Sequence, residues 1–141
     1  IEVSLKRREY APKNIELLAK FIPRKILFVL HFEEKAQFAI HHTKLICSEW
    51  QQCDTLNIPL TGLDLDAVWE NIVATIGSIT VQEGNTLTEQ IVIDDEHAKL
   101  IKQIELLEKK ARSEKQPRKK LELYSKIQTI GISIILIFIH F

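Results

Sequence analysis

The densest group of residues that could do chemistry is a run of basic side chains in the last third of the sequence. Between positions 109 and 120 there are seven lysines and arginines and one acidic residue, Glu114. The basic residues are Lys109, Lys110, Arg112, Lys115, Arg118, Lys119 and Lys120. Such density on an exposed helix is typical of contacts with backbone phosphates, in which counterion release drives binding and no base is read. We therefore predict a nucleic-acid-binding site at these residues.

The same run has other interpretations. The chain carries 19 basic and 19 acidic residues and no net charge, but residues 45–98 hold ten acidic residues and no lysine or arginine. A basic helix can neutralise such a segment, within the fold or across a dimer, or it can simply be a solvated face. No aromatic residue is interleaved with the basic ones, so a base-stacking platform is not predicted.

A second candidate is Lys6, at the exit of an apolar strand that a helix and a buried strand follow. Metal-dependent nucleases of the PD-(D/E)xK class place a carboxylate and a lysine there, the carboxylate to bind the metal and the lysine to assist the attacking water. Here Ser4 stands at the carboxylate position, and Glu2 lies too far along the strand. We therefore predict no catalytic residue. The alternative is a nuclease, active or degenerate, that uses Lys6 with carboxylates from further upstream.

The histidines and cysteines do not form a recognisable metal or redox motif. His41 and His42 are adjacent on a predicted strand, so they face opposite sides of it and cannot chelate one ion together. Cys47 and Cys53 are too far apart for a CxxC pair and indicate two free thiols in a reducing cytoplasm. We predict no metal, no cofactor and no small-molecule ligand.

Hydrophobic periodicity indicates the elements that must position these residues. In order they are a strand at 1–6, a helix at 15–22, strands at 26–30 and 36–46, and a helix at 63–76. The first helix allows a parallel, right-handed crossover between the first two strands. Pro23 and Gly77 end the two helices. The run at 26–30 is apolar throughout, as expected of a central strand buried on both faces.

A long helix follows this sheet. Thr86 and Glu89 have the spacing of a capping box that opens it, and an apolar stripe from Ile93 to Ala111 advances by four and three residues in turn, as in a heptad repeat. Pro117 breaks the helix, and the pattern continues beyond. The stripe must be buried by the sheet domain, by the second arm segment or by another chain. The last case predicts a homodimer through Ile93, Leu100, Ile104 and Leu107.

The predicted fold class is α+β: a small mixed β-sheet with packed helices, in the order β-α-β-β-α, and a C-terminal coiled-coil-like helical arm. We assign residues 1–84 to the α+β domain, 85–129 to the arm and 130–141 to an apolar tail. The tail is too short to span a bilayer, which takes about 20 residues. It is interpreted as out-of-frame sequence, a truncated membrane segment or a core strand. The chain contains no methionine, so we expect its natural start to lie upstream.

Three segments resemble one protein family. They read IPRKILFVL at 22–30, LTGLDLDAVWEN at 60–71 and LEKKARSEKQPRKK at 107–120. In this order they resemble the prokaryotic domain of unknown function numbered 4391, and we expect the chain to be an N-terminally truncated member of that family. Members of that family have no established activity and are longer at the N-terminus. The resemblance implies a DNA-related accessory role, because members are often encoded near helicase and methyltransferase genes of restriction or phage-defence islands.

These observations lead to one functional hypothesis and two alternatives. The hypothesis is a non-enzymatic, cytoplasmic accessory subunit that touches DNA phosphates with its basic arm, or bridges to a helicase or methyltransferase partner. The alternatives are the metal-dependent nuclease and a coiled-coil dimerisation module. A salt-dependent affinity for DNA distinguishes the hypothesis from the dimer, in which the acidic segment would occupy the basic one.

Overall fold

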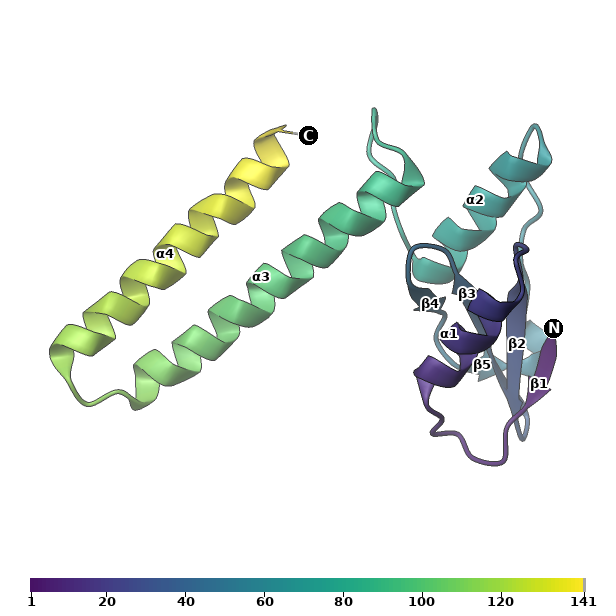
Figure 1. The fold of residues 1–141 in the computed structure, drawn as a ribbon, viewed down its shortest axis with the longest axis horizontal. Coiled ribbons are helices and arrows are strands. Elements are labelled where there is room, and N and C mark those ends of the chain that lie inside the picture. The colour runs from purple at the N-terminus through teal and green to yellow at the C-terminus, as the bar shows by residue number, and fades with distance from the viewer. Residues whose placement is uncertain (141) are drawn as a thin grey trace. The chain divides into compact units, whose positions relative to one another are not determined.

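The computed structural model describes residues 1–140 of the chain. The chain divides into two compact units, Ile1–Val81 and Gln82–Phe141, and each is described here by itself. Phe141 lies outside the described residues. The first unit holds a β-sheet with its helices, and the second is a pair of long helices (Figure 1).

The first unit is a mixed sheet with helices. Its elements are β1 (Glu2–Ser4), α1 (Pro12–Phe21), β2 (Leu27–Phe32), β3 (Lys35–His41), β4 (Leu45–Cys47), β5 (Gln51–Gln52), a short 3-10 helix η1 (Cys53–Thr55) and α2 (Leu65–Gly77). The strand order is β1-β2-β3-β4, and β5 pairs with β3 beside β4. β1 is parallel to β2, and the other pairs are antiparallel. The predicted α+β class and the parallel pairing of the first two strands are confirmed.

The single strand predicted at 36–46 is wrong, because the chain turns in its middle. β3 ends at His41 and β4 begins at Leu45, and the backbone N–H of His42 donates to the carbonyl of Lys44 across the turn, at 3.0 Å. The apolar residues continue on both sides of this turn, so hydrophobic pattern alone does not show it. β5 has two residues, too few for any periodicity to appear.

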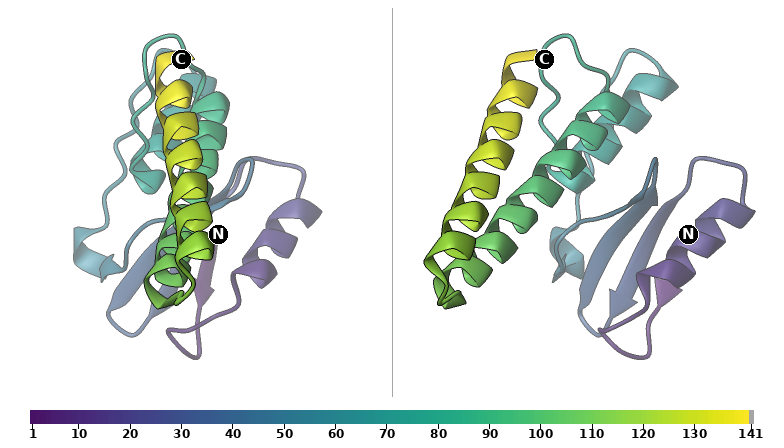
Figure 2. Two further views of the ribbon diagram at one scale, coloured as in Figure 1. Left: turned by 90° about the vertical axis from the view of Figure 1, so that its left-hand side faces the viewer. Right: turned by 60° about the vertical axis from the view of Figure 1, so that its left-hand side comes forward.

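α1 lies against one face of the sheet (Figures 1 and 2), and side chains from both form the first part of the core. The cluster consists of Ile15, Phe28, Leu30 and Ala39, all less than 5% exposed. Phe28 and Ala39 are register partners in β2 and β3, so their side chains share this face. Val29, on the opposite face of β2, is only half-buried, so β2 is less enclosed than its apolar run predicts.

The second helix packs on the opposite face. Ile40 and Ile46 are register partners that point away from α1, and both are buried, as is Val73 of α2. A Cβ atom added to Gly77 would lie 2.9 Å from a methyl group of Ile46, so the end of α2 touches the sheet closely. Asp64 caps the start of α2 by accepting a hydrogen bond from the backbone of Ala67. The sheet is therefore covered by one helix on each face.

The second unit is a helical hairpin. α3 (Leu87–Ser113) and α4 (Pro117–His140) run antiparallel and side by side in both figures. The capping box predicted at Thr86 and Glu89 is present, and Pro117 starts α4 because a proline at the first position loses no helical hydrogen bond. The predicted break at Pro117 is therefore confirmed.

Burial along the hairpin follows one stripe on each helix. On α3 the half-buried or buried positions include Ile93, Leu100, Ile104, Leu107 and Ala111, and on α4 they include Leu123, Ile127, Ile130 and Ile134. α3 and α4 contact each other, so the second arm segment of the same chain lies against the helix that carries the heptad stripe. Ala111 is fully buried near the turn, where a small side chain lets the two helices approach.

The apolar residues from 130 to 140 continue α4 as helix, which differs from the core strand considered for this segment. Its outer face carries Ile132, Ile135 and Leu136, each more than half exposed. Within residues 1–140, no helix combines the length and the apolar character needed to cross a bilayer.

Candidate functional site

The seven predicted basic residues gather around the turn of the helical hairpin. Three of them, Lys109, Lys110 and Arg112, lie in the last turns of α3, and Lys115 lies in the connection. The other three, Arg118, Lys119 and Lys120, follow Pro117 in the first turn of α4. We call these seven residues the basic tip. The hairpin is the reason they converge: a continuous helix would spread the same residues over about 17 Å of one rod.

Most of the basic tip faces solvent. Six of its residues are exposed and Lys120 is half-buried. Arg112 pairs with Glu108 at 3.3 Å, and Arg118 pairs with Glu122 at 3.6 Å. Both are surface pairs one helical turn apart, which contribute little to stability and separate easily when a stronger anion approaches. The tip therefore presents its positive charges to the surroundings.

The helix dipoles stabilise the basic residues at the end of α3 and destabilise those at the start of α4. Lys110 and Arg112 lie in the last turn of α3, where the negative end of the dipole favours cations. Arg118 and Lys119 lie at the positive end of α4, whose first turn contains no acidic residue. Cations at that end oppose helix formation. The first turn of α4 thus carries charges that its own folding does not favour, and an anion bound at the tip would relieve the conflict.

A shallow cavity of about 400 Å³ lies between the two helices at the tip. Lys110, Lys119 and Lys126 line it together with two carboxylates, Glu114 and Glu122. Glu114 accepts a hydrogen bond from the backbone N–H of Gln116 at 2.9 Å, so part of its charge is used to hold the turn. Lysines from both helices therefore line one hollow, and their ammonium groups can contact the oxygens of a phosphate bound there.

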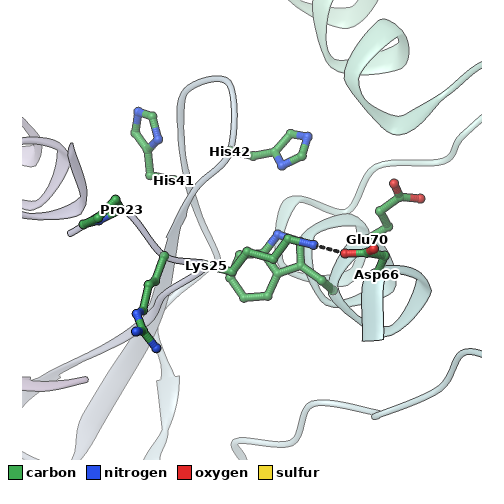
Figure 3. Close-up of a pocket in the computed structure, with 8 residues that line it drawn as sticks. Pro23, Lys25, His41, His42, Asp66 and Glu70 are labelled. Atoms are coloured by element: carbon green, nitrogen blue, oxygen red, sulfur yellow. Dashed lines mark hydrogen bonds and ion pairs between the residues drawn. The ribbon is translucent and has the colours of Figure 1, made fainter. Parts of the chain in front are cut away.

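A second hollow, of about 510 Å³, lies in the first unit between the end of α1, the β3–β4 turn and the start of α2 (Figure 3). The Lys25 ammonium donates to the Asp66 carboxylate across it, and this contact lowers the pKa of Asp66. His41 ends β3 and His42 lies in the β3–β4 turn, so the predicted placement of both on one strand is wrong, and their side chains point in different directions (Figure 3). The charges here are of both signs and partly paired, so the hollow does not favour an anion as the basic tip does.

The residues considered for catalysis do not converge around Lys6. Lys6 is exposed beyond the end of β1, whereas Glu2 reaches the neighbouring strand, where its carboxylate lies 3.4 Å from Nε2 of His31. Within residues 1–140, no group of three or more histidine, cysteine, aspartate and glutamate side chains could hold a metal ion. The nuclease alternative gains no support from the described part of the chain.

His31 belongs to a cluster that the sequence analysis missed. Its other ring nitrogen, Nδ1, lies 3.6 Å from Sγ of Cys53, so Glu2, His31 and Cys53 form a chain of contacts. These residues are far apart in sequence and come from β1, β2 and the start of η1. Only the strand pairing brings them together, and no local motif signals it.

The other cysteine, Cys47, has a different environment. Its Sγ lies 3.7 Å from the Tyr10 hydroxyl, which donates to Oε1 of Gln37 at 2.9 Å. Burial raises the pKa of the Cys47 thiol and is also the main cause of a raised pKa at Tyr10. Both groups are therefore held in their neutral forms, as expected of structural side chains. Cys47 and Cys53 are both free thiols.

Comparison with known proteins identifies the family. The sequence matches the family described as "Domain of unknown function (DUF4391)" over residues 1–132. The chain belongs to this family, which confirms the resemblance found in the three sequence segments. A search of curated proteins and a search of solved structures each gave no match.

Proposed function

We propose that this member of the DUF4391 family is a non-enzymatic accessory protein that binds the phosphate backbone of DNA through its basic tip. The observation that supports the proposal most directly is the convergence of seven basic residues from two helix ends and their connection, with six of them exposed. The unfavourable cations in the first turn of α4 add to it, because their presence is explained by an anionic ligand.

Binding of this kind has a characteristic dependence on salt. Each phosphate neutralised releases condensed counterions, so the logarithm of the affinity falls with the logarithm of salt by about 0.9 per contact. Contacts from all seven residues of the tip would give a slope of about −6. Residues 109–120 contain no aromatic side chain on which a base could stack. We therefore expect little preference for base sequence and no preference for unstacked bases.

The test is fluorescence anisotropy of a labelled 20-base-pair duplex with the full chain over a salt series. The tip variant carries glutamate at four exposed positions, Lys109, Lys115, Arg118 and Lys119. The control variant has the same change in net charge at four exposed positions away from the tip, namely Lys6, Arg7, Lys13 and Lys99.

We expect the tip variant to bind more weakly than the wild type at low salt and with a shallower salt slope, and the control variant to retain most of its affinity and its slope. Equal losses in both variants would mean that only net charge matters, and the basic tip would not be the site. Unchanged binding in the tip variant would contradict the proposal as well. Circular dichroism of both variants would show that the helical content is kept.

The proposal includes a protein partner and a cytoplasmic location. A DNA-processing protein, of the helicase or methyltransferase kind that the family resemblance implies, would act beside the bound duplex in the cytoplasm. Two free cysteines fit a reducing compartment. The homodimer through Ile93, Leu100, Ile104 and Leu107 stays a separate expectation, and all four residues are half-buried on a helix that contacts α4 of the same chain.

A further inference from the structure

The contact chain of Glu2, His31 and Cys53 has the order of an acid, a base and a nucleophile. Sγ of Cys53 lies 3.6 Å from Nδ1 of His31, within hydrogen-bond distance for sulfur. Oε1 of Glu2 lies 3.4 Å from Nε2 of the same ring. A carboxylate near one imidazole nitrogen favours the tautomer that carries its proton there, which leaves the other nitrogen free to accept a proton. Here the accepting nitrogen is the one that faces the thiol.

The strand pairing explains why the three groups meet. Ser4 is the register partner of His31, and Glu2 shares the face of Ser4 because side chains alternate along a strand. On the other side, His31 is paired with Ala36 of β3, and Ala36 is paired with Gln51 of β5. Ala36 is completely buried. Cys53, directly after β5, occupies that side of the sheet next to His31.

The thiol is close to solvent. Cys53 is half-buried, and the two residues before it and the two after it are exposed. The backbone N–H of Cys53 donates to the carbonyl of Glu34 at 3.0 Å, which fixes the start of η1 and with it the direction of the side chain. The His31 side chain is 26% exposed, and that of Glu2 is 72% exposed. A small molecule can therefore approach the sulfur while His31 stays in contact with it.

We propose that Cys53 is a reactive thiol with His31 as its base and Glu2 as the residue that orients His31, and that it exchanges with low-molecular-weight disulfides. In this step the Cys53 proton passes to Nδ1 of His31, and Sγ attacks one sulfur of the disulfide. A new S–S bond forms as the old one breaks, and the departing thiolate takes the proton from His31. Cys53 is oxidised to a mixed disulfide, and the small disulfide is reduced to one thiol.

Cys47 provides an internal control in the same molecule. Burial raises the pKa of its thiol, and a tyrosine hydroxyl rather than an imidazole is its neighbour. The thiolate is the attacking species, and an ordinary thiol is only a few per cent thiolate at pH 7. A base in contact with the sulfur can therefore raise the rate by about tenfold or more. Cys47 has no such base and should react slowly.

The experiment uses glutathione disulfide and the full chain at pH 7, with the modification of each cysteine followed by mass spectrometry of its peptide. Four proteins are compared: the wild type, His31→Gln, Glu2→Gln, and His41→Gln as a control at another histidine of the same sheet. We expect Cys53 to be modified at least about tenfold faster than Cys47 in the wild type and in His41→Gln. His31→Gln should remove most of this difference, and Glu2→Gln should reduce it.

The rate at Cys47 separates a loss of the base from a loss of the fold. If a variant loosens the sheet, Cys47 becomes accessible and its rate rises, whereas the loss of orientation alone leaves Cys47 slow. Equal rates at Cys47 and Cys53 in the wild type would overturn the proposal. An unchanged Cys53 rate in His31→Gln would also overturn it, because the base would then have no role.

Discussion

Substitutions at Lys110 and Lys119 can separate the effect of tip charge on DNA binding from its effect on folding stability. Both line the same hollow at the tip, but Lys110 lies in the last turn of α3 and Lys119 is the third residue of α4. Replacing either with glutamate changes the charge of the tip equally. The two changes meet opposite ends of a helix dipole, so their effects on folding should differ in sign.

The magnitudes follow from the positions. A charge in the first or last turn of an exposed helix is worth about 0.3 to 1 kcal/mol, and a like-charge neighbour one turn away costs about 0.2 to 0.5 kcal/mol. Lys119→Glu places an anion at the positive end of α4 with Glu122 three residues away, for a net gain of about 0.5 kcal/mol in the free energy of unfolding. Lys110→Glu places one at the negative end of α3 near Glu114, for a loss of about 1 kcal/mol.

The assay pairs urea unfolding, followed by circular dichroism, with anisotropy on the same duplex. We expect both variants to bind DNA more weakly, with the salt slope reduced by about one unit each, while Lys119→Glu is more stable than the wild type and Lys110→Glu less stable. The reasoning would be refuted if affinity followed stability, with Lys119→Glu binding as well as the wild type and only Lys110→Glu impaired. It would also fail if Lys119→Glu were destabilised.

Other predictions concern the fold. A Cβ atom added at Gly62 would lie 2.6 Å from the backbone at the start of α2, whereas one added at Gly131 has no atom within 4 Å. Gly62→Ala should therefore destabilise the first unit by about 2 kcal/mol, and Gly131→Ala should stabilise α4 by about 0.5 to 1 kcal/mol. Urea unfolding measures both effects. Thr86→Ala removes the capping box of α3 and should cost about 1 kcal/mol in the same measurement. Burial raises the pKa of Tyr10 and of Cys47, so the unfolded chain releases these protons first, and stability should fall as pH rises through the ordinary values of about 8.5 for cysteine and 10 for tyrosine. A urea midpoint constant from pH 8 to 11 would contradict that reasoning.

The sequence was informative where local pattern and local chemistry agree. The capping box at Thr86, the break at Pro117 and the presence of a strand at β2 each depend on a few neighbouring residues, so they could be predicted. The turn at 42–44 and the two-residue β5 could not, because they interrupt or escape the hydrophobic periodicity. The partner of the heptad stripe was also open, since the spacing at Ile93 and Leu100 does not distinguish a second helix of the same chain from another molecule.

The two candidate sites also differ in how far the sequence predicts them. The residues of the basic tip are close together in the sequence, so the sequence predicts them, whereas the relation of each charge to a helix end depends on the hairpin. The contacts among Glu2, His31 and Cys53 depend on the pairing of β1 with β2 and of β3 with β5. No spacing in the sequence indicates such pairing, and only the sheet register brings a base to the thiol.

The measurement that tests the central claim most directly is the salt slope of DNA binding by the full chain and by the fourfold tip variant. The account predicts a wild-type slope of several units, approaching about −6, and a reduction by about three to four units in the variant that lacks Lys109, Lys115, Arg118 and Lys119. Absence of binding by the wild type at low salt would contradict it, and so would a slope that is the same in both proteins.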